Sequence, residues 1–366
     1  MKPPFHADHV GSLIRPRSLI EARKANLEGK LPASALAPLE DQAVDDMIAM
    51  QERVGIEAIT DGEARRNNWR DRFFERVDGF SADRIPSTFI FTSDDGVQSR
   101  GMPIPVVTGK LKRRETLTTD DFKYVKRRTK KTAKATLPSP AANHFFSGDA
   151  SLKNSPYRSR AEFFDDVSAI YRQEIADLHA AGCTYLQIDE VPIAVLCDPK
   201  NGDRVRARGE DPDQLVDDYI KAINDSVRDK PAGMTVCVHL CRGNNGKGQG
   251  SGGYDSVAER LFQQTNCDGF FLEYDTERAG DFTPLRHLPK NKHAILGVIS
   301  TKIRDLEPVD EVRKRIDAAG KYAPVEQLGI SPQCGFASSY MVDRFTSDDE
   351  ERKLAHVVEI ARRIWG

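Results

Sequence analysis

Short apolar runs alternate along the chain with stretches in which apolar residues recur every three or four positions. The runs are typical of strands buried on both faces, and the periodic stretches are typical of amphipathic helices. The expected strands are Ala7–Ser12, Ile56–Thr60, Ala133–Leu137, Thr184–Ile188, Met234–Leu240, Gly269–Leu272, Ala294–Val298 and Leu328–Ser331. The expected helices are Leu36–Val54, Arg160–Ala181, Pro212–Asp229, Ser256–Thr265, Pro308–Ala319 and Asp348–Ile364. These repeated strand–helix units predict an α/β fold, a single (β/α)8 TIM barrel over residues 1–366.

Two segments interrupt this repeat. Residues 83–115 contain short alternating runs, which predict a β-hairpin insertion after the second strand. Residues 242–253 read RGNNGKGQGSGG directly after the fifth strand. Such a glycine-rich loop is expected to be mobile, and it is either a lid over the site or an idle surface loop. An open doubly wound sheet is the alternative fold, but no GxGxxG or GxxxxGK[ST] motif follows an expected strand.

Charge and composition remove several classes of protein. The net charge is −2, and the basic run from Lys123 to Lys134 has a single aromatic residue, Tyr124, and no known nucleic-acid-binding motif, so nucleic acid is not an expected partner. No run of about 18 apolar residues exists to span a membrane, and the N-terminus lacks the apolar core of a signal peptide. We therefore expect a cytoplasmic protein, with a homodimer as an open expectation. Six cysteines are too few for a disulfide scaffold and suit metal or catalytic chemistry better.

Four residues with metal-binding side chains lie where expected strands end. The active site of a (β/α)8 barrel lies at the carboxyl ends of its strands. His239 and Cys241 have the same parity at the end of the fifth strand, so their side chains point the same way. Glu273 ends the sixth strand and Cys334 follows the eighth. Each alone is more often a core or ion-pair residue, but two sulfurs, one nitrogen and one carboxylate together predict a Zn2+ site.

A second group of strand-end residues suits an amino acid. His9, Gly11 and Ser12 end the first expected strand, where backbone N–H groups and a hydroxyl suit a carboxylate. Glu63 follows the second strand and Asp189 the fourth, and two carboxylates suit an ammonium group. The alternative interpretation is that these residues cap the ends of the elements.

Several segments, in order along nearly the whole chain, resemble the catalytic barrel of the cobalamin-independent methionine synthase family. They are HADHVGSLIRP, DGEARRNNW, LPSPA, LQIDE, HLCRGN, LEYD and GISPQCGF. The resemblance implies a zinc-dependent methyltransferase that forms methionine from homocysteine. It implies that zinc is held by His239, Cys241, Glu273 and Cys334. It also implies that Gly11 and Ser12 hold the homocysteine carboxylate, and that Glu63 and Asp189 hold its amino group.

The chain departs from the family pattern where the methyl donor would react. The family's proton-donor histidine follows the seventh strand, but here that stretch reads GVISTKIRD, and the family's tryptophan after the third strand is replaced within PAANHFFSGD. Lys302 and His144 are the candidates for the catalytic acid. The donor is methyltetrahydrofolate or a methylcorrinoid. One alternative is zinc-dependent alkyl transfer to another small thiol, or from a corrinoid, sulfonium or epoxide donor. Two further alternatives are a metal-free uroporphyrinogen-decarboxylase-like enzyme and a non-catalytic zinc protein.

Overall fold

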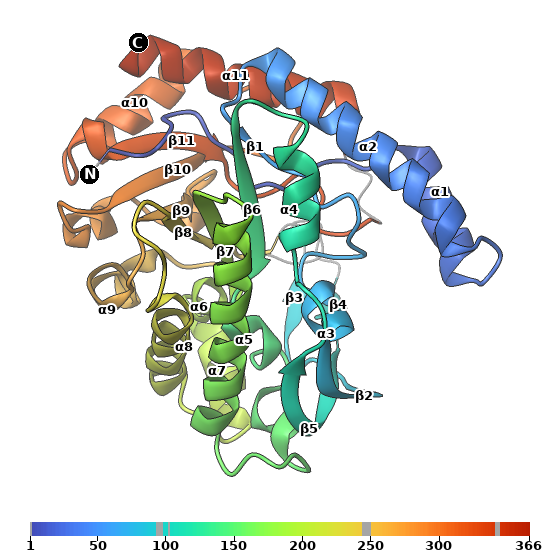
Figure 1. Cartoon of the computed structure of the whole chain (residues 1–366). Helices are drawn as coiled ribbons and strands as arrows, with labels where there is room; N and C mark the ends of the chain where they lie inside the picture. Colours follow the sequence, from blue (N-terminus) through green and yellow to red (C-terminus); the bar gives the residue numbers. More distant parts are fainter. Residues whose placement is uncertain (1, 93–97, 102, 244–249, 341–344) are drawn as a thin grey trace.

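The computed structural model describes residues 2–92, 98–101, 103–243, 250–340 and 345–366. Its main sheet contains seven parallel strands in the order β1-β6-β7-β8-β9-β10-β11. These strands are β1 (Ala58–Ile59), β6 (Thr132–Pro138), β7 (Tyr185–Glu190), β8 (Thr235–Leu240), β9 (Gly269–Glu273), β10 (His293–Ile299) and β11 (Leu328–Pro332). The sheet curls with helices around it, as the sequence predicts for a TIM-type barrel (Figure 1).

The first predicted strand, residues 7–12, is not a strand in the structure. Ala7 makes one isolated parallel bridge to Ile330 of β11. On the other side of the segment, Thr60 Oγ1 donates a hydrogen bond to Gly11 O at 2.7 Å. The segment thus lies between β11 and the loop after β1. It closes the barrel without forming a continuous ladder of backbone hydrogen bonds. Gly11 has φ 127°, a conformation outside the β region, so a regular strand cannot continue through it.

All six predicted helices are present, and the described residues form five more that the periodicity does not reveal. The helices are α1 (Arg17–Leu27), α2 (Ala33–Val54), α3 (Asp71–Arg76), α4 (Thr119–Lys126), α5 (Arg160–Ala180), α6 (Val191–Leu196), α7 (Pro199–Ala207), α8 (Pro212–Val227), α9 (Ala258–Gln264), α10 (Val309–Ala319) and α11 (Ser347–Trp365). Short 3-10 turns are η1 (Pro140–Asn143), η2 (Gly148–Leu152), η3 (Tyr254–Ser256), η4 (Glu277–Ala279), η5 (Thr283–His287) and η6 (Val325–Gln327). The added helices are mostly shorter than about three turns, too short for a clear period of 3.6 residues.

Local chemistry fixes several helix ends. Ser159 caps α5 by accepting the Glu162 N–H, and Thr346 forms a capping box with Asp349 at the start of α11. Gly55, with φ 92°, ends α2 in the left-handed conformation that favours glycine. The two N-caps fix where α5 and α11 begin, and Gly55 fixes where the chain leaves α2 toward β1.

The insertion begins earlier than predicted. A long antiparallel ribbon pairs β2 (Val77–Ile85) with β5 (Ile104–Arg113), and a small hairpin pairs β3 (Ile90–Thr92) with β4 (Gln98–Arg100). The β-hairpin insertion is therefore confirmed, with its start moved from residue 83 to Val77. Its first strand, VDGFSADRI, is only partly buried along most of its length and therefore contains many polar residues. The sequence pattern does not show it as a strand for this reason. In Figure 1 the β2–β5 ribbon extends from one end of the barrel, and the helical hairpin of α1 and α2 projects at the side.

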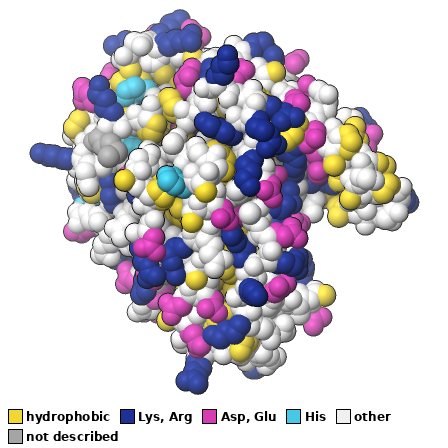
Figure 2. Space-filling view, viewed as in Figure 1, with side chains coloured by type: hydrophobic (Ala, Val, Ile, Leu, Met, Phe, Trp, Pro, Cys, Tyr) yellow, Lys and Arg dark blue, Asp and Glu magenta, His cyan; other side chains and the backbone are white. Residues whose placement is uncertain are grey.

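Charges of both signs lie on the face of the molecule that Figure 2 shows. Figure 2 shows basic and acidic side chains interspersed over the visible face, which agrees with a net charge of −2. The basic run occupies α4 and the turn before β6, at the amino end of that strand. It therefore lies away from the carboxyl strand ends, and its last member, Lys134, is buried in an ion pair with Asp8 at 3.0 Å. None of the described helices is both long and apolar enough to cross a bilayer.

Candidate metal and thiol site

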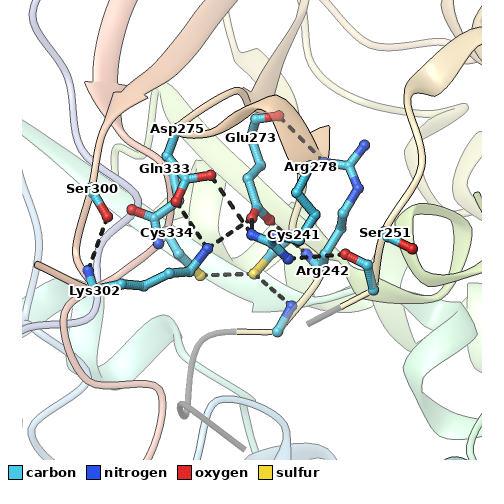
Figure 3. Close-up of polar contacts among 12 residues, drawn as sticks. Cys241, Arg242, Ser251, Glu273, Asp275, Arg278, Ser300, Lys302, Gln333 and Cys334 are labelled. Atoms are coloured by element: carbon cyan, nitrogen blue, oxygen red, sulfur yellow. Dashed lines mark hydrogen bonds and ion pairs between the residues drawn. The ribbon is translucent and has the colours of Figure 1, made fainter. Parts of the chain in front are cut away.

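Two buried cysteines meet at the carboxyl ends of β8 and β11. The sulfur atoms of Cys241 and Cys334 lie 2.8 Å apart (Figure 3). Both cysteines are free, and this separation is too long for the ~2.05 Å bond of a disulfide. The hydrogen bond between the sulfurs lowers the pKa of Cys241 and raises that of Cys334 well above its usual range. The pair therefore favours one thiolate, which is the form that binds a metal.

His239 of β8 completes a group of three metal-binding side chains. Its ligand atom and the two sulfurs all lie within 4.8 Å of one another. Asp189 Oδ1 is 3.0 Å from Nδ1 of the imidazole, whereas Nε2 is buried and has no hydrogen-bond partner among the described residues. A carboxylate on one ring nitrogen with the other nitrogen free is how metal-binding histidines are commonly oriented. Burial lowers the pKa of His239, but the hydrogen bond to Asp189 and the charges of Asp189 and Cys241 together outweigh burial and raise it.

Glu273, the fourth predicted ligand, lies beside the sulfurs but its oxygens are already engaged. Oε1 accepts hydrogen bonds from Arg278 at 2.9 Å and Lys302 at 3.0 Å, and Oε2 accepts the Arg242 N–H at 2.8 Å (Figure 3). Burial raises the pKa of this carboxyl, and the surrounding cations, Lys302 first, outweigh burial and lower it. The structure thus holds Glu273 as a carboxylate, next to the three-residue group rather than in it.

Lys302, a candidate acid, is part of this charged cluster. Its ammonium group bridges Glu273 and Asp275, 2.9 Å from Asp275 Oδ2. Burial lowers the pKa of Lys302, but the two carboxylates outweigh burial and raise it. The amine is therefore held protonated beside the sulfurs.

His144, the other candidate acid, belongs to a different group of residues. Its Nδ1 lies 2.9 Å from the Tyr219 hydroxyl and its Nε2 lies 2.9 Å from Asp149 Oδ1. Glu210 joins His144 and Asp149 in this second group, but Arg208 pairs with Glu210 at 2.7 Å. Both ring nitrogens are occupied, so the geometry gives no support to a catalytic proton transfer by His144.

Gly11 and Ser12 lie next to the Cys334 loop. The Phe336 N–H donates to Ser12 O at 2.9 Å, and a Cβ placed on Gly335 would lie 1.8 Å from Ser12 Oγ. Glycine at position 335 therefore makes room for the Ser12 hydroxyl beside a proposed metal ligand. Gly11 is confined in the same way, because an added Cβ would lie 2.8 Å from Thr136 Cγ2.

Glu63 combines a strained backbone with an unpartnered oxygen. Its φ of 56° is the one positive value among the described non-glycine residues. Arg66 lies 3.3 Å from Oε1, while Oε2 is buried without a described hydrogen-bond partner. Burial raises the pKa of Glu63 to about 7, and the charge of Asp189 adds to the rise. Strain of about 1–3 kcal/mol persists where surrounding structure enforces it, and it often marks a functional site.

His9 lies on the barrel wall and is not brought to this group. Its Nε2 is 2.9 Å from Ala58 O, and burial lowers its pKa to about 4. The neutral imidazole thus links the closing segment to β1. The glycine-rich loop cannot be placed, because residues 244–249 lie outside the described residues.

Comparison with known proteins decides the family. Residues 6–362 match the family model described as the catalytic domain of cobalamin-independent synthase. The chain belongs to the cobalamin-independent methionine synthase family. It is 37% identical to the uncharacterized protein YxjH of Bacillus subtilis, over 100% of this chain and 96% of that protein. Membership in this family makes the chain a methyltransferase of the methionine synthase type, and it excludes the uroporphyrinogen-decarboxylase alternative.

Solved structures agree with the methionine synthase fold. One from Listeria monocytogenes, provisionally named a vitamin-B12-independent methionine synthase, has a TM-score of 0.79 at 31% identity and covers 100% of this chain and 99% of that one. A B12-independent methionine synthase from Shewanella sp. W3-18-1, in complex with selenomethionine, has a TM-score of 0.75 at 22% identity. It covers 98% of this chain and 97% of that one. The second comparison shows the fold alone.

The barrel also contains site residues that the sequence did not reveal. Gln187 Nε2 donates to Asp189 Oδ1 at 2.7 Å and to Val10 O at 2.6 Å, so it fixes the carboxylate that orients His239. Its strand parity with Asp189 was a usable signal. Arg278 gave no such signal, because its approach to Glu273 depends on the loop after β9.

Proposed function

We propose that this chain is a zinc-dependent S-methyltransferase that methylates the thiol of homocysteine to form methionine. The observation that carries the proposal is the buried group of His239, Cys241 and Cys334, in which Nε2 of the histidine has no described partner. A buried polar nitrogen without a hydrogen bond costs free energy, and a metal ligand role accounts for it.

The donor chemistry of the group fits Zn2+. Two thiolate sulfurs and one imidazole nitrogen are its usual ligands, and Glu273 would supply the fourth from β9. Bound zinc lowers the pKa of a coordinated thiol, so a substrate that is mostly protonated near neutral pH becomes a thiolate. Asp189 and Gln187 keep the imidazole in the tautomer that leaves Nε2 free.

The residues around the group suit the amino-acid end of homocysteine. Ser12 and the backbone at Gly11 would bind the carboxylate, and Glu63 and Asp189 would bind the ammonium group. The free Oε2 of Glu63 supports this role. The Shewanella relative, crystallised with the selenium analogue of methionine, is consistent with such a ligand.

In the reaction, a carbon–sulfur bond forms to the substrate sulfur as the methyl group leaves its donor. With methyltetrahydrofolate the methyl–nitrogen bond breaks, and the departing nitrogen needs a proton. Lys302 is held protonated between Glu273 and Asp275, its charge acts on Cys334, and it is our candidate donor. A methylcorrinoid donor needs no such proton, and alkyl transfer to another small thiol or from a sulfonium or epoxide is the alternative proposal.

X-ray absorption at the zinc edge tests the metal and the thiol together. We expect two sulfur ligands in the purified protein and a third on adding homocysteine, with methylation detected as methionine. Cys334→Ser is expected to lose zinc and activity, whereas Cys183→Ser, a buried cysteine outside the group, is expected to keep both. Full zinc occupancy in Cys334→Ser would end the proposal, and an unchanged zinc spectrum with homocysteine would redirect it to another thiol.

A further inference from the structure

Arg15 is a buried cation that binds backbone rather than an acid. Arg15 belongs to the segment between Ser12 and α1, and only 2% of the residue is exposed. The guanidinium donates to Glu63 O at 2.7 Å, to Leu13 O at 3.2 Å and to Ala337 O, with a longer contact of 3.5 Å to Arg66 O. Within the described part of the chain, no carboxylate oxygen lies in ion-pair contact with it.

The carbonyls that Arg15 binds belong to three separate loops. Leu13 directly follows Ser12, the loop after β1 contains Glu63, and Ala337 stands three residues after Cys334. Each loop thus carries one residue of the proposed site. Ser12 is proposed to bind the substrate carboxylate, Glu63 its ammonium group, and Cys334 the metal. A guanidinium has five N–H donors in a rigid plane, so one side chain can fix the relative positions of all three loops.

Burial and the neighbouring charges change the pKa of Arg15. Burial lowers the pKa of the guanidinium to about 10; Glu63 and Asp61 oppose the fall, and Arg23 and Arg66 add to it. The group therefore stays charged at neutral pH. A charge buried without an ion-pair partner is costly, and a purely structural link between loops needs only neutral hydrogen bonds.

We propose that Arg15 is the positioning residue that sets the spacing of Ser12, Glu63 and Cys334, and that it thereby makes the site select thiols with an amino-acid end over plain thiols. The inference deepens the proposed function and rests on it. It differs from a simple folding role because it predicts a loss that depends on the substrate.

Binding calorimetry on the zinc-loaded full chain tests this role without relying on turnover. The probes are homocysteine and 2-mercaptoethanol, a thiol with neither amino nor carboxyl group. In Arg15→Met we expect homocysteine to bind at least about tenfold more weakly and 2-mercaptoethanol to change by less than about twofold. Arg15→Lys, which keeps the charge but not the planar fork, is expected to show a smaller loss of the same kind.

Arg17→Met is the matched control, because Arg17 lies two residues away, is 91% exposed in its side chain and pairs only with Glu21 in the described structure. It should leave both affinities unchanged. Equal losses for both thiols in Arg15→Met, or undiminished homocysteine binding, would overturn the proposal. Should Arg15→Met lack native circular dichroism, Arg15→Lys decides by the same criterion. A wild-type protein that binds both thiols equally would instead contradict the proposed function, before any variant is compared.

Discussion

At the scale of single residues, Asp189 is asked to do two things: its Oδ1 orients His239, and the carboxylate is proposed to bind the substrate ammonium. Asn at this position keeps an acceptor for the imidazole but loses the charge. We expect Asp189→Asn to weaken homocysteine binding by about 10–100-fold, and binding of a thiol without an amino group by much less. Glu190→Gln is the control, since Glu190 caps α6 through the Ile193 N–H. Competition against a fluorescent thiol would measure both; equal losses would show that Asp189 does not bind the ammonium.

At the scale of elements, the sequence predicted the strands and helices that a local apolar pattern defines. It did not predict the contacts that depend on the path of the loops. Seven of the eight expected strands exist, because buried parallel strands are short apolar runs. The remaining one, the first strand at residues 7–12, was wrong because Gly11 interrupts it and tertiary contacts replace the ladder. The same division holds in the site. Strand parity predicted that His239 and Cys241 converge, but the cations that hold Glu273 come from loops whose path no periodicity records.

The N-terminus of α11 provides a pH test at this scale. Glu350 is buried and accepts the Ile14 N–H at 3.0 Å, and burial raises its pKa from 4.5 to about 8. In the unfolded chain this carboxyl ionises at lower pH, so its contribution to stability is present below about pH 4.5 and is lost as the pH rises toward about 8. Gln accepts the same hydrogen bond and does not titrate. We expect the free energy of unfolding of the wild type to fall relative to Glu350→Gln from about pH 5 to about pH 8 in urea melts. Glu351→Gln, at a half-buried neighbour paired with Arg53, should not reproduce this trend. A constant difference for Glu350→Gln would contradict the burial argument.

At the scale of the whole molecule, the proposed ligands tie distant parts of the barrel together. His239 and Cys241 belong to β8 and its loop, and Cys334 follows β11, with β9 and β10 between them in the sheet. A metal held only by the folded chain stabilises it by mass action, because the unfolded chain does not gather these ligands. Zinc removal should therefore lower the melting temperature of the entire barrel rather than loosen one loop.

The zinc-dependent part of the melting temperature also tests whether Glu273 is the fourth ligand. We expect zinc loading to raise the melting temperature of the wild type by at least about 5 °C over chelated protein. Glu273→Gln should lose much of this increment, because an amide is a weaker zinc ligand than a carboxylate. Asp275→Asn is the matched control, since Asp275 shares Lys302 and Arg278 with Glu273 but is not a proposed ligand. Comparing increments removes the effect of the broken ion pairs, which acts with and without metal. Equal increments in the two variants would leave zinc with His239, Cys241 and Cys334 alone among the protein side chains, and would assign Glu273 to holding Lys302 in place.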